Sequence, residues 1–287
     1  MDRHFSDRHF STRLPERANI EHLKEQAKDI LRQYHLGNSQ AINRFHERCP
    51  RRRKGIGNTN LAEAQLVVAR EYGFESWPKL RVYVASLKVA GKERAMLKRA
   101  MSHLRAGKLC IIFDDEGREN EGDFVLAAES ASPEAINFIT KHGRGTLCLA
   151  LTEEHAAKLK LWPINSQRTS VSEPAFLNSI DAAHGITTGV SAFDRASTIL
   201  AAVREDVRPE DLKSPGHIFP LRAVSGGLQV RRGHTEGSIA LVEMAGLKPA
   251  AVICEIMNDD GSMARWPDLE KLAQEHDLPI LKISDLL

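Results

Sequence analysis

The sequence predicts one mixed α/β domain over residues 93–287, with helices packed on a sheet, preceded by a small all-helical module. Short apolar runs of strand length, for example residues 109–113 and 252–257, alternate with helical stretches in the second part of the chain. In the first part, apolar residues recur at spacings of three and four, which indicates amphipathic helices. The composition, 42% hydrophobic and 27% charged over 287 residues, is that of an ordinary globular protein.

Charge, apolar runs and cysteines exclude several classes of protein. The formal net charge of +2 points to no particular partner. No apolar run approaches the ~20 residues that a membrane span requires, and the N-terminus lacks the apolar core of a signal peptide. The four cysteines form no CxxC pair, and three of them lie in apolar runs, as is typical of reduced, buried thiols. We therefore expect a cytoplasmic protein without a membrane partner.

Two segments precede the α/β domain. Residues 1–19 begin with a tandem duplicate that lacks apolar periodicity, which predicts a flexible arm. Residues 20–92 form the helical module, in which Asn60 and Glu63 predict a capping box. A basic stretch at residues 50–55 has no interleaved aromatic residues, so it predicts a solvated loop and no nucleic-acid partner. The module has no catalytic pattern, and a packing role or a protein partner is the working hypothesis.

Gly91 and its charged surroundings mark the predicted boundary before the α/β domain, which opens with a new helix and then an acidic stretch between two predicted strands. This stretch covers residues 114–123 (DDEGRENEGD). Carboxylates crowded in this way repel one another unless a cation lies among them. Two interpretations remain open from the residues alone: a solvated charged loop, which composition favours, or an acid/base loop with oxygen ligands for Mg²⁺ or Mn²⁺.

A phosphate site is predicted at residues 231–236 (RRGHTE). Thr235 is a good N-cap for the helix expected to follow. Arg231, Gly233 and His234 would then surround a helix N-terminus, where free N–H groups and the positive end of the helix dipole favour an anion.

Two acidic residues farther along the chain have both structural and functional interpretations. Glu255 lies inside an apolar run, and a buried glutamate must be paired, protonated or functional. Ser191 and Asp194 form a predicted capping pair for the next helix, so Asp194 has a purely structural explanation.

Four segments, occurring in one order, closely resemble 3,4-dihydroxy-2-butanone 4-phosphate synthases, enzymes of riboflavin biosynthesis. They are residues 114–123, 215–222 (PGHIFPLR), 231–236 and 253–261 (ICEIMNDDG). The resemblance covers about residues 93–287 and implies a three-layer α/β sandwich that works as a homodimer, with active sites near the subunit interface. It leaves no room for the GTP cyclohydrolase II domain often fused behind, and the helical module is not part of the usual family pattern.

The resemblance implies a lyase that converts D-ribulose 5-phosphate to L-3,4-dihydroxy-2-butanone 4-phosphate and formate with Mg²⁺ or Mn²⁺. Glu119 and His234 match the metal ligands. The candidates for catalysis are His217, Glu255, Glu121 and Asp123. Substrate contacts and other residues that line the site match Arg118, Glu119, Asp123, Cys148, Asp194, Arg231, Arg232, Gly233, His234, Thr235 and Glu255.

Each match also has a plain alternative. Glu255 could be a paired core carboxylate, His217 a strand-edge histidine and Arg231 a surface cation, but the shared order of the motifs favours the functional interpretation. Within the acidic stretch, residues 114–116 keep the solvated interpretation. The segment 168–178 departs from the family, because it carries a Pro-Ala-Phe-Leu sequence where a Thr-Ala-Phe-Thr type is usual.

Two other hypotheses about function remain. The altered segment motivates a divergent paralogue that acts on a related sugar phosphate. A catalytically inert scaffold with a partner-binding helical module is the second, and the presence of Glu119, His217 and Glu255 argues against it.

Overall fold

A computed structural model describes residues 14–15, 18–49, 59–164 and 173–287 of the chain. Most of the predicted arm, the basic stretch at residues 50–55 and residues 168–172 of the altered segment lie outside the described residues. The chain folds into two compact units, Met1–Lys92 and Glu93–Leu287. Among the described residues, no helix has the length and apolar character needed to cross a membrane.

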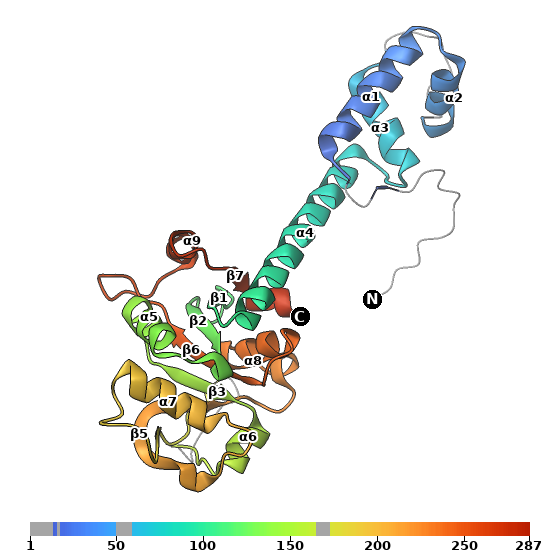
Figure 1. Ribbon diagram of the computed structural model, residues 1–287. Helices are drawn as coiled ribbons and strands as arrows, with labels where there is room; N and C mark the ends of the chain where they lie inside the picture. Colours follow the sequence, from blue (N-terminus) through green and yellow to red (C-terminus); the bar gives the residue numbers. More distant parts are fainter. Residues whose placement is uncertain (1–13, 16–17, 50–58, 165–172) are drawn as a thin grey trace. The chain divides into compact units, whose positions relative to one another are not determined.

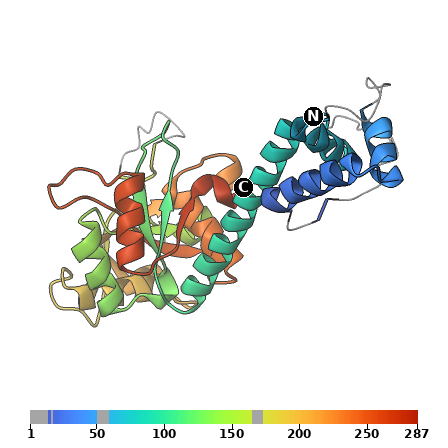
Figure 2. The same ribbon diagram turned by 90° about the horizontal axis from the view of Figure 1, so that it is seen from above.

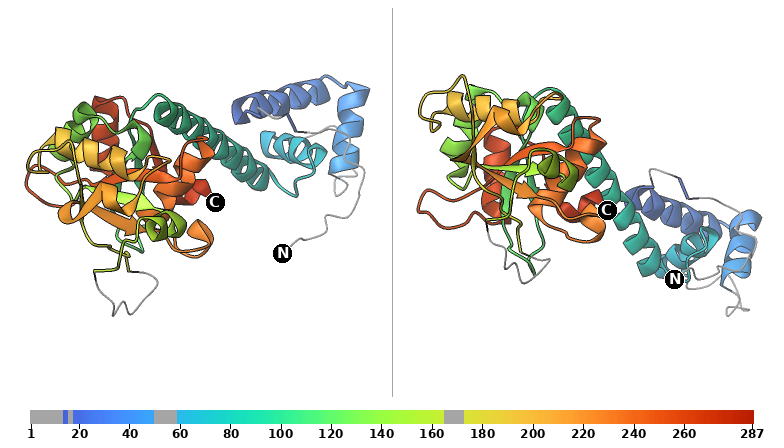
Figure 3. Two further views of the ribbon diagram at one scale, coloured as in Figure 1. Left: turned by 60° about the horizontal axis from the view of Figure 1, so that its bottom comes forward. Right: turned by 90° about the horizontal axis from the view of Figure 1, so that it is seen from below.

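The first unit is helical (Figures 1 and 3). Its helices are α1 (Ile20–His35), α2 (Ser39–Arg48), α3 (Leu61–Glu71) and the first part of α4 (Trp77–Arg105). The predicted capping box is confirmed, because Asn60 accepts the Glu63 N–H and Glu63 accepts the Asn60 N–H. Helices α1 and α3 lie side by side, and the rings of Tyr34 and Phe45 (centroids 4.5 Å apart) join α1 to α2. Buried apolar side chains from these helices form a core that belongs to this unit alone.

The expectation that a separate helix follows the boundary at Gly91 is wrong, because helix α4 runs without interruption from Trp77 to Arg105. A glycine inside a helix costs only about 1 kcal/mol relative to alanine. The residues that follow it, Lys92 to Ala95, are good helix formers and carry the helix forward.

The second unit is built on a mixed sheet, as predicted, and this sheet has seven strands. Its strands are β1 (Cys110–Phe113), β2 (Gly122–Ala127), β3 (Cys148–Leu151), β4 (Ile180–Ala182), β5 (Leu212–Arg222), β6 (Ala250–Glu255) and β7 (Ile280–Lys282). Their order across the sheet is β4-β5-β3-β6-β2-β1-β7. The β1–β7 and β3–β5 pairs are parallel, and the remaining pairs are antiparallel.

Helices cover both faces of this sheet and complete the predicted three-layer sandwich (Figures 1 and 2). The helices are α5 (Pro133–Gly143), α6 (Glu153–Lys158), α7 (Ala192–Ala202), α8 (His234–Met244) and α9 (Trp266–Glu275). Strand β2 shows how its sequence serves both layers: Phe124 faces the core under α5, α7 and α9, whereas Val125 faces the core under α8 and the end of α4. A strand buried on both faces is therefore apolar throughout, and the polar Asp123 on it needs an explanation.

Candidate active site

The acidic stretch connects β1 to β2 and is folded around the side chain of Asp114. Asp114 is buried, and its carboxylate accepts the main-chain N–H groups of Glu119 (3.1 Å) and Glu121 (2.9 Å). It also accepts a hydrogen bond from the Arg118 guanidinium (2.8 Å). The solvated interpretation is thus wrong for Asp114, because this side chain replaces the main-chain partners that a tight loop lacks. The next two carboxylates, at positions 115 and 116, are exposed.

Glu119 and His234 face each other across the mouth of this loop. Glu119 Oε2 lies 2.7 Å from Arg118 Nη1 and 3.4 Å from His234 Nδ1. These contacts, His234 first, outweigh partial burial and lower the pKa of Glu119 to about 2. The other ring nitrogen, His234 Nε2, lies 3.1 Å from the carbonyl oxygen of Glu121, to which it donates. A ring held in this way directs Nδ1 toward Glu119.

Asp123 is buried beside this pair. Its Oδ1 has no hydrogen-bond partner among the described residues and lies 3.8 Å from His234 Nε2. Burial raises the pKa of Asp123 to about 7; His234 opposes the rise, and Glu255, directly opposite on β6, adds to it. Burial lowers the pKa of His234, but the surrounding carboxylates, Asp123 first, raise it more, to about 9. The cluster therefore favours a positive charge among its carboxylates.

These residues fit a divalent cation. Asp114, Glu119 and His234 offer ligand atoms that all lie within 4.8 Å of one another. Both oxygens of Asp114 already bind the loop, so Glu119 and His234 are the candidate ligands. Carboxylate oxygen suits a hard cation, and a metal-bound histidine commonly donates its second ring N–H to a carbonyl, as His234 does.

The start of α8 supplies the positive end of the site. The N-cap is Gly233, and the first helical residue is His234, so the prediction that Thr235 is the N-cap is wrong. No described side chain caps this end, which leaves its N–H groups for an anion. A Cβ atom on Gly233 would lie 2.2 Å from Arg231 Nη1 and 3.1 Å from Arg118 Nη2. A side chain at this position would displace the two guanidinium groups that approach the helix N-terminus.

Arg231 is nearly buried and is held by an ion pair inside the same region. Its Nη1 lies 2.6 Å from Glu236 Oε2, and the other oxygen of Glu236 accepts the N–H of Val224 (3.0 Å). The interpretation of Arg231 as a surface cation is thus wrong, and its guanidinium keeps one orientation.

Glu255 ends strand β6 at the wall of the site. Its Oε2 accepts the N–H of Thr146, just before β3 (2.7 Å). Gly145 allows this approach, because a Cβ atom there would lie 2.6 Å from Glu255 Oε2. Glu255 is partly exposed, so it is not a carboxylate enclosed in the core. The neighbouring Cys148 is buried, and burial raises the pKa of its thiol, which makes it a poor nucleophile.

One cavity of about 230 Å³ brings most of the predicted site residues together. The predicted residues that line it are Arg118, Glu119, Glu121, Asp123, Cys148, Arg231, His234, Thr235 and Glu255. Pro174 and Phe176 also line it, so part of the altered segment forms an apolar wall, whereas Leu177 is buried in the core. The predicted residues that do not line it are Gly233, just beside it, and Arg232, Asp194 and His217.

His217 belongs to a second cluster, on strands β4 and β5. Its Nδ1 lies 2.8 Å from Asp181 Oδ2, and its main-chain N–H donates to Asp181 Oδ1 (3.0 Å). Asp194 does not bond His217; it accepts the N–H groups of Thr187 (3.1 Å) and Gly189 (3.0 Å) in the loop beside the pair. Sequence reasoning missed Asp181, although an aspartate within a short apolar strand was a signal that could have found it.

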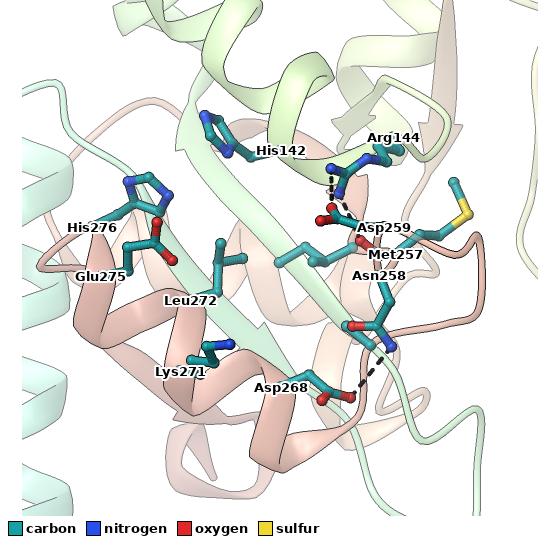
Figure 4. Close-up of a pocket in the computed structure, with 12 residues that line it drawn as sticks. His142, Arg144, Met257, Asn258, Asp259, Asp268, Lys271, Leu272, Glu275 and His276 are labelled. Carbon is teal, nitrogen blue, oxygen red and sulfur yellow. Dashed lines mark hydrogen bonds and ion pairs between the residues drawn. The ribbon is translucent and has the colours of Figure 1, made fainter.

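A larger cavity, of about 430 Å³, lies between the end of α5 and α9 and holds none of the predicted site residues (Figure 4). Two of its charged groups form an ion pair, with Arg144 Nη2 2.5 Å from Asp259 Oδ1, and Asn258 reaches Asp268 (3.4 Å). Size alone therefore does not mark the site, whereas unpaired buried charge does.

Comparisons with known proteins identify the family. The family model described as 3,4-dihydroxy-2-butanone 4-phosphate synthase matches residues 98–287. The chain belongs to this family. A 3,4-dihydroxy-2-butanone 4-phosphate synthase of Neisseria meningitidis serogroup B is 54% identical over 188 residues, which are 65% of this chain and 52% of that protein. The riboflavin biosynthesis protein RibBA of Aquifex aeolicus is 52% identical over 67% of this chain and 48% of its own length.

The chain thus spans about half the length of these two relatives of the 3,4-dihydroxy-2-butanone 4-phosphate synthase family. A synthase of Serratia proteamaculans is 50% identical, and the match covers 88% of it. Among solved structures, a two-domain synthase from A. baumannii has a TM-score of 0.64 at 48% identity, over 66% of this chain and 56% of that one. A synthase in complex with two magnesium ions has a TM-score of 0.63 at 35% identity, over 66% of this chain and 94% of that one.

Proposed function

We propose that this protein converts D-ribulose 5-phosphate to L-3,4-dihydroxy-2-butanone 4-phosphate and formate. One observation carries the proposal: a single cavity joins the Glu119–His234 pair, the unpartnered carboxylate oxygen of Asp123 and an uncapped helix N-terminus. The two ends of this cavity suit the two ends of a sugar phosphate. The phosphate group would bind at the start of α8 near Arg231, and the sugar oxygens would lie toward Glu119.

Glu119 and His234 would hold Mg²⁺ or Mn²⁺. When bound, the cation supplies positive charge that polarises oxygen atoms of the substrate. A relative of known structure is a complex with two magnesium ions, which supports this choice of cation.

The reaction needs groups that move protons, because the substrate loses its C3 proton and its C1 hydroxyl as water, and a water molecule must add back before C4 leaves as formate. Glu255 is suited to such a transfer, since the N–H of Thr146 holds its carboxylate at the cavity wall and no cation of the protein pairs with it among the described residues. The loop carboxylates Glu121 and Asp123 line the same cavity and are further candidates.

We also propose a homodimer in which His217 acts in the cavity of the partner subunit. His217 does not line the cavity of its own chain, and its side chain is 44% exposed. The loop at Gly189 contacts His217. Two apolar residues that follow Gly189 in the sequence are exposed: Val190 at 55% and Phe193 at 68%. A second copy that covered these residues would bury apolar surface and bring His217 to a second cavity.

The first experiment is incubation of the purified protein with D-ribulose 5-phosphate and Mg²⁺, with formate measured over time. Formate that appears only with the divalent cation supports the proposal. A folded protein that releases no formate refutes it. Family membership, with the cavity intact, does not favour the alternatives of an inert scaffold or of a paralogue with another substrate.

Subunit mixing tests the dimer. Glu119→Gln and His217→Ala variants, each inactive alone, form hybrid dimers in which one site has both residues intact. Because random mixing makes half of the dimers hybrid, activity should return to about a quarter of the wild-type value. No recovery, with subunit exchange shown by a tag on one variant, would place both residues in a site within one chain.

For the helical unit we propose a protein partner, and for the chain a cytoplasmic location. The unit has an apolar groove formed by Leu31, Leu36 and Leu61, with Lys28 and Arg32 at its rim. The buried free thiols in the second unit suit a reducing compartment.

A further inference from the structure

The His217–Asp181 pair has a geometry that defines which ring nitrogen carries a proton. A carboxylate oxygen accepts hydrogen bonds, so the contact of 2.8 Å between Nδ1 and Asp181 Oδ2 requires a proton on Nδ1. The second oxygen of Asp181 accepts the main-chain N–H of His217 at 3.0 Å. Asp181 is buried and makes both contacts to one residue, so it fixes the ring and the main chain together.

We propose that Asp181 is a positioning residue of the synthase, which holds His217 with Nδ1 protonated and makes Nε2 the atom that exchanges protons with the substrate. This inference rests on the proposed function. A neutral imidazole with its proton on Nδ1 has a lone pair on Nε2, which accepts a proton, and the resulting cation can return it. Asp181 stabilises that cation and does not touch the substrate itself.

A loop shields the hydrogen bond between the two residues. Gly189 has φ of +91°, and a Cβ atom on it would lie 2.4 Å from Asp181 Oδ2 and 2.5 Å from His217 Nδ1. The main chain of Gly189 therefore packs against the bond itself. Asp194 holds this loop in place through the N–H of Gly189 (3.0 Å) and the hydroxyl of Thr187 (2.7 Å). Asp194 thus acts on the pair through this loop, although it does not line the cavity.

Asp181→Asn is the direct test, because the variant changes the tautomer with little change in shape. The main-chain N–H of His217 selects the amide oxygen at the Oδ1 position, so the amide NH₂ must face Nδ1. Nδ1 then becomes the acceptor and the ring proton moves to Nε2, where no lone pair remains. We expect kcat to fall by about 100-fold or more, as for a wrong tautomer in other histidine pairs, with KM changed less than threefold.

The tautomer is measured on the full-length protein with Mg²⁺ by long-range ¹H–¹⁵N NMR of ¹⁵N-histidine, with the His217 signals assigned from their loss in His217→Gln. We expect Nδ1 to be protonated in the wild type and Nε2 in Asp181→Asn. A wild-type ring protonated on Nε2, or wild-type kcat in Asp181→Asn, overturns the positioning role. Absence of formate from the wild type refutes the proposed function instead, and the NMR result still decides the tautomer.

Two further variants keep the test independent of folding. Gly189→Ala should lower kcat while Asp181 stays in place, because the added methyl group meets both partners. Asp211→Asn is the matched control near the start of β5, where Asp211 pairs with the exposed Arg204 (3.0 Å), and it should keep wild-type kcat. If Asp211→Asn lowered kcat as much as Asp181→Asn, the effect would be a general loss of a carboxylate and the proposal would fail.

Discussion

The two clusters of predicted site residues differ in how completely their charges are paired. Around Glu119 and His234, four carboxylates and two arginines share one cavity, and a buried oxygen of Asp123 has no partner within the described chain. Around His217, by contrast, both oxygens of Asp181 are bonded and the loop above them is held by its own contacts.

This difference separates two kinds of site. Buried polar groups without partners are costly, so they persist where a ligand completes them. A pair whose bonds are complete instead presents one defined atom, here Nε2 of His217. We therefore expect the first cluster to respond to cation and substrate, and the second to respond to changes in hydrogen bonding.

The largest effect is expected for Glu119→Gln. The variant removes one charge from the pair that would hold the cation, and the amide is a weaker ligand for a hard cation. Formate release should fall at least about 1,000-fold, and Mg²⁺ affinity, measured by calorimetry, should fall with it. Glu116→Gln, at an exposed position of the same loop, is the control and should keep both properties. Normal Mg²⁺ affinity in Glu119→Gln would remove this residue from the ligand set.

Glu255→Gln comes next, because a general acid or base contributes about 100- to 10,000-fold to a rate. The amide can still accept the N–H of Thr146, so the fold should be kept while proton transfer is lost. We expect kcat to fall within that range and thermal stability to change little. Glu270→Gln on the exposed side of α9 serves as the control. A Glu255→Gln enzyme with wild-type kcat would show that the proton is carried elsewhere, with Glu121 the next candidate.

Asp114→Asn should lower the stability of the loop, and with it the free energy of unfolding. Asn cannot accept at both oxygen positions, so one main-chain N–H of the loop or the Arg118 guanidinium loses its partner. The loss of such a buried bond costs about 2 kcal/mol, measurable by urea unfolding. Asp115→Asn, at an exposed neighbour, should leave the free energy of unfolding unchanged. Equal stability of the two variants would mean that Asp114 does not anchor the loop.

Local patterns predicted much of this molecule. Apolar runs predicted strands such as β1 and β6 but not β4, and the Asn60–Glu63 pair predicted its capping box, because these patterns depend on neighbours within a few residues. The expectation of a new helix after Gly91 was wrong, because one glycine costs too little free energy to end a helix. The N-cap of α8 was misplaced by two residues, since Thr235 is buried inside the first turn.

The order of the motifs predicted part of the site. The part that depends on how strands pair could not be predicted from the sequence. Glu119, His234 and Glu255 were named from their motifs, and one cavity holds them. The pairing of Asp181 with His217 depends on the register between β4 and β5, which includes an irregularity at Asp181. No spacing along the chain reveals such a contact, because it is set by how the two strands align.

The smallest effect is expected from removal of residues 1–92. The truncated chain begins where the second unit begins, and it keeps Ala100 and Leu104 of α4, which are fully buried against the sheet. We therefore expect kcat and KM within about twofold of the full-length values, because all the residues that line the cavity belong to the second unit. A cut after Arg105 is the control; it removes these core residues and should destabilise the domain. If the chain that starts at Glu93 were stable but inactive, the helical unit would take part in catalysis, and partner binding would no longer be its leading explanation.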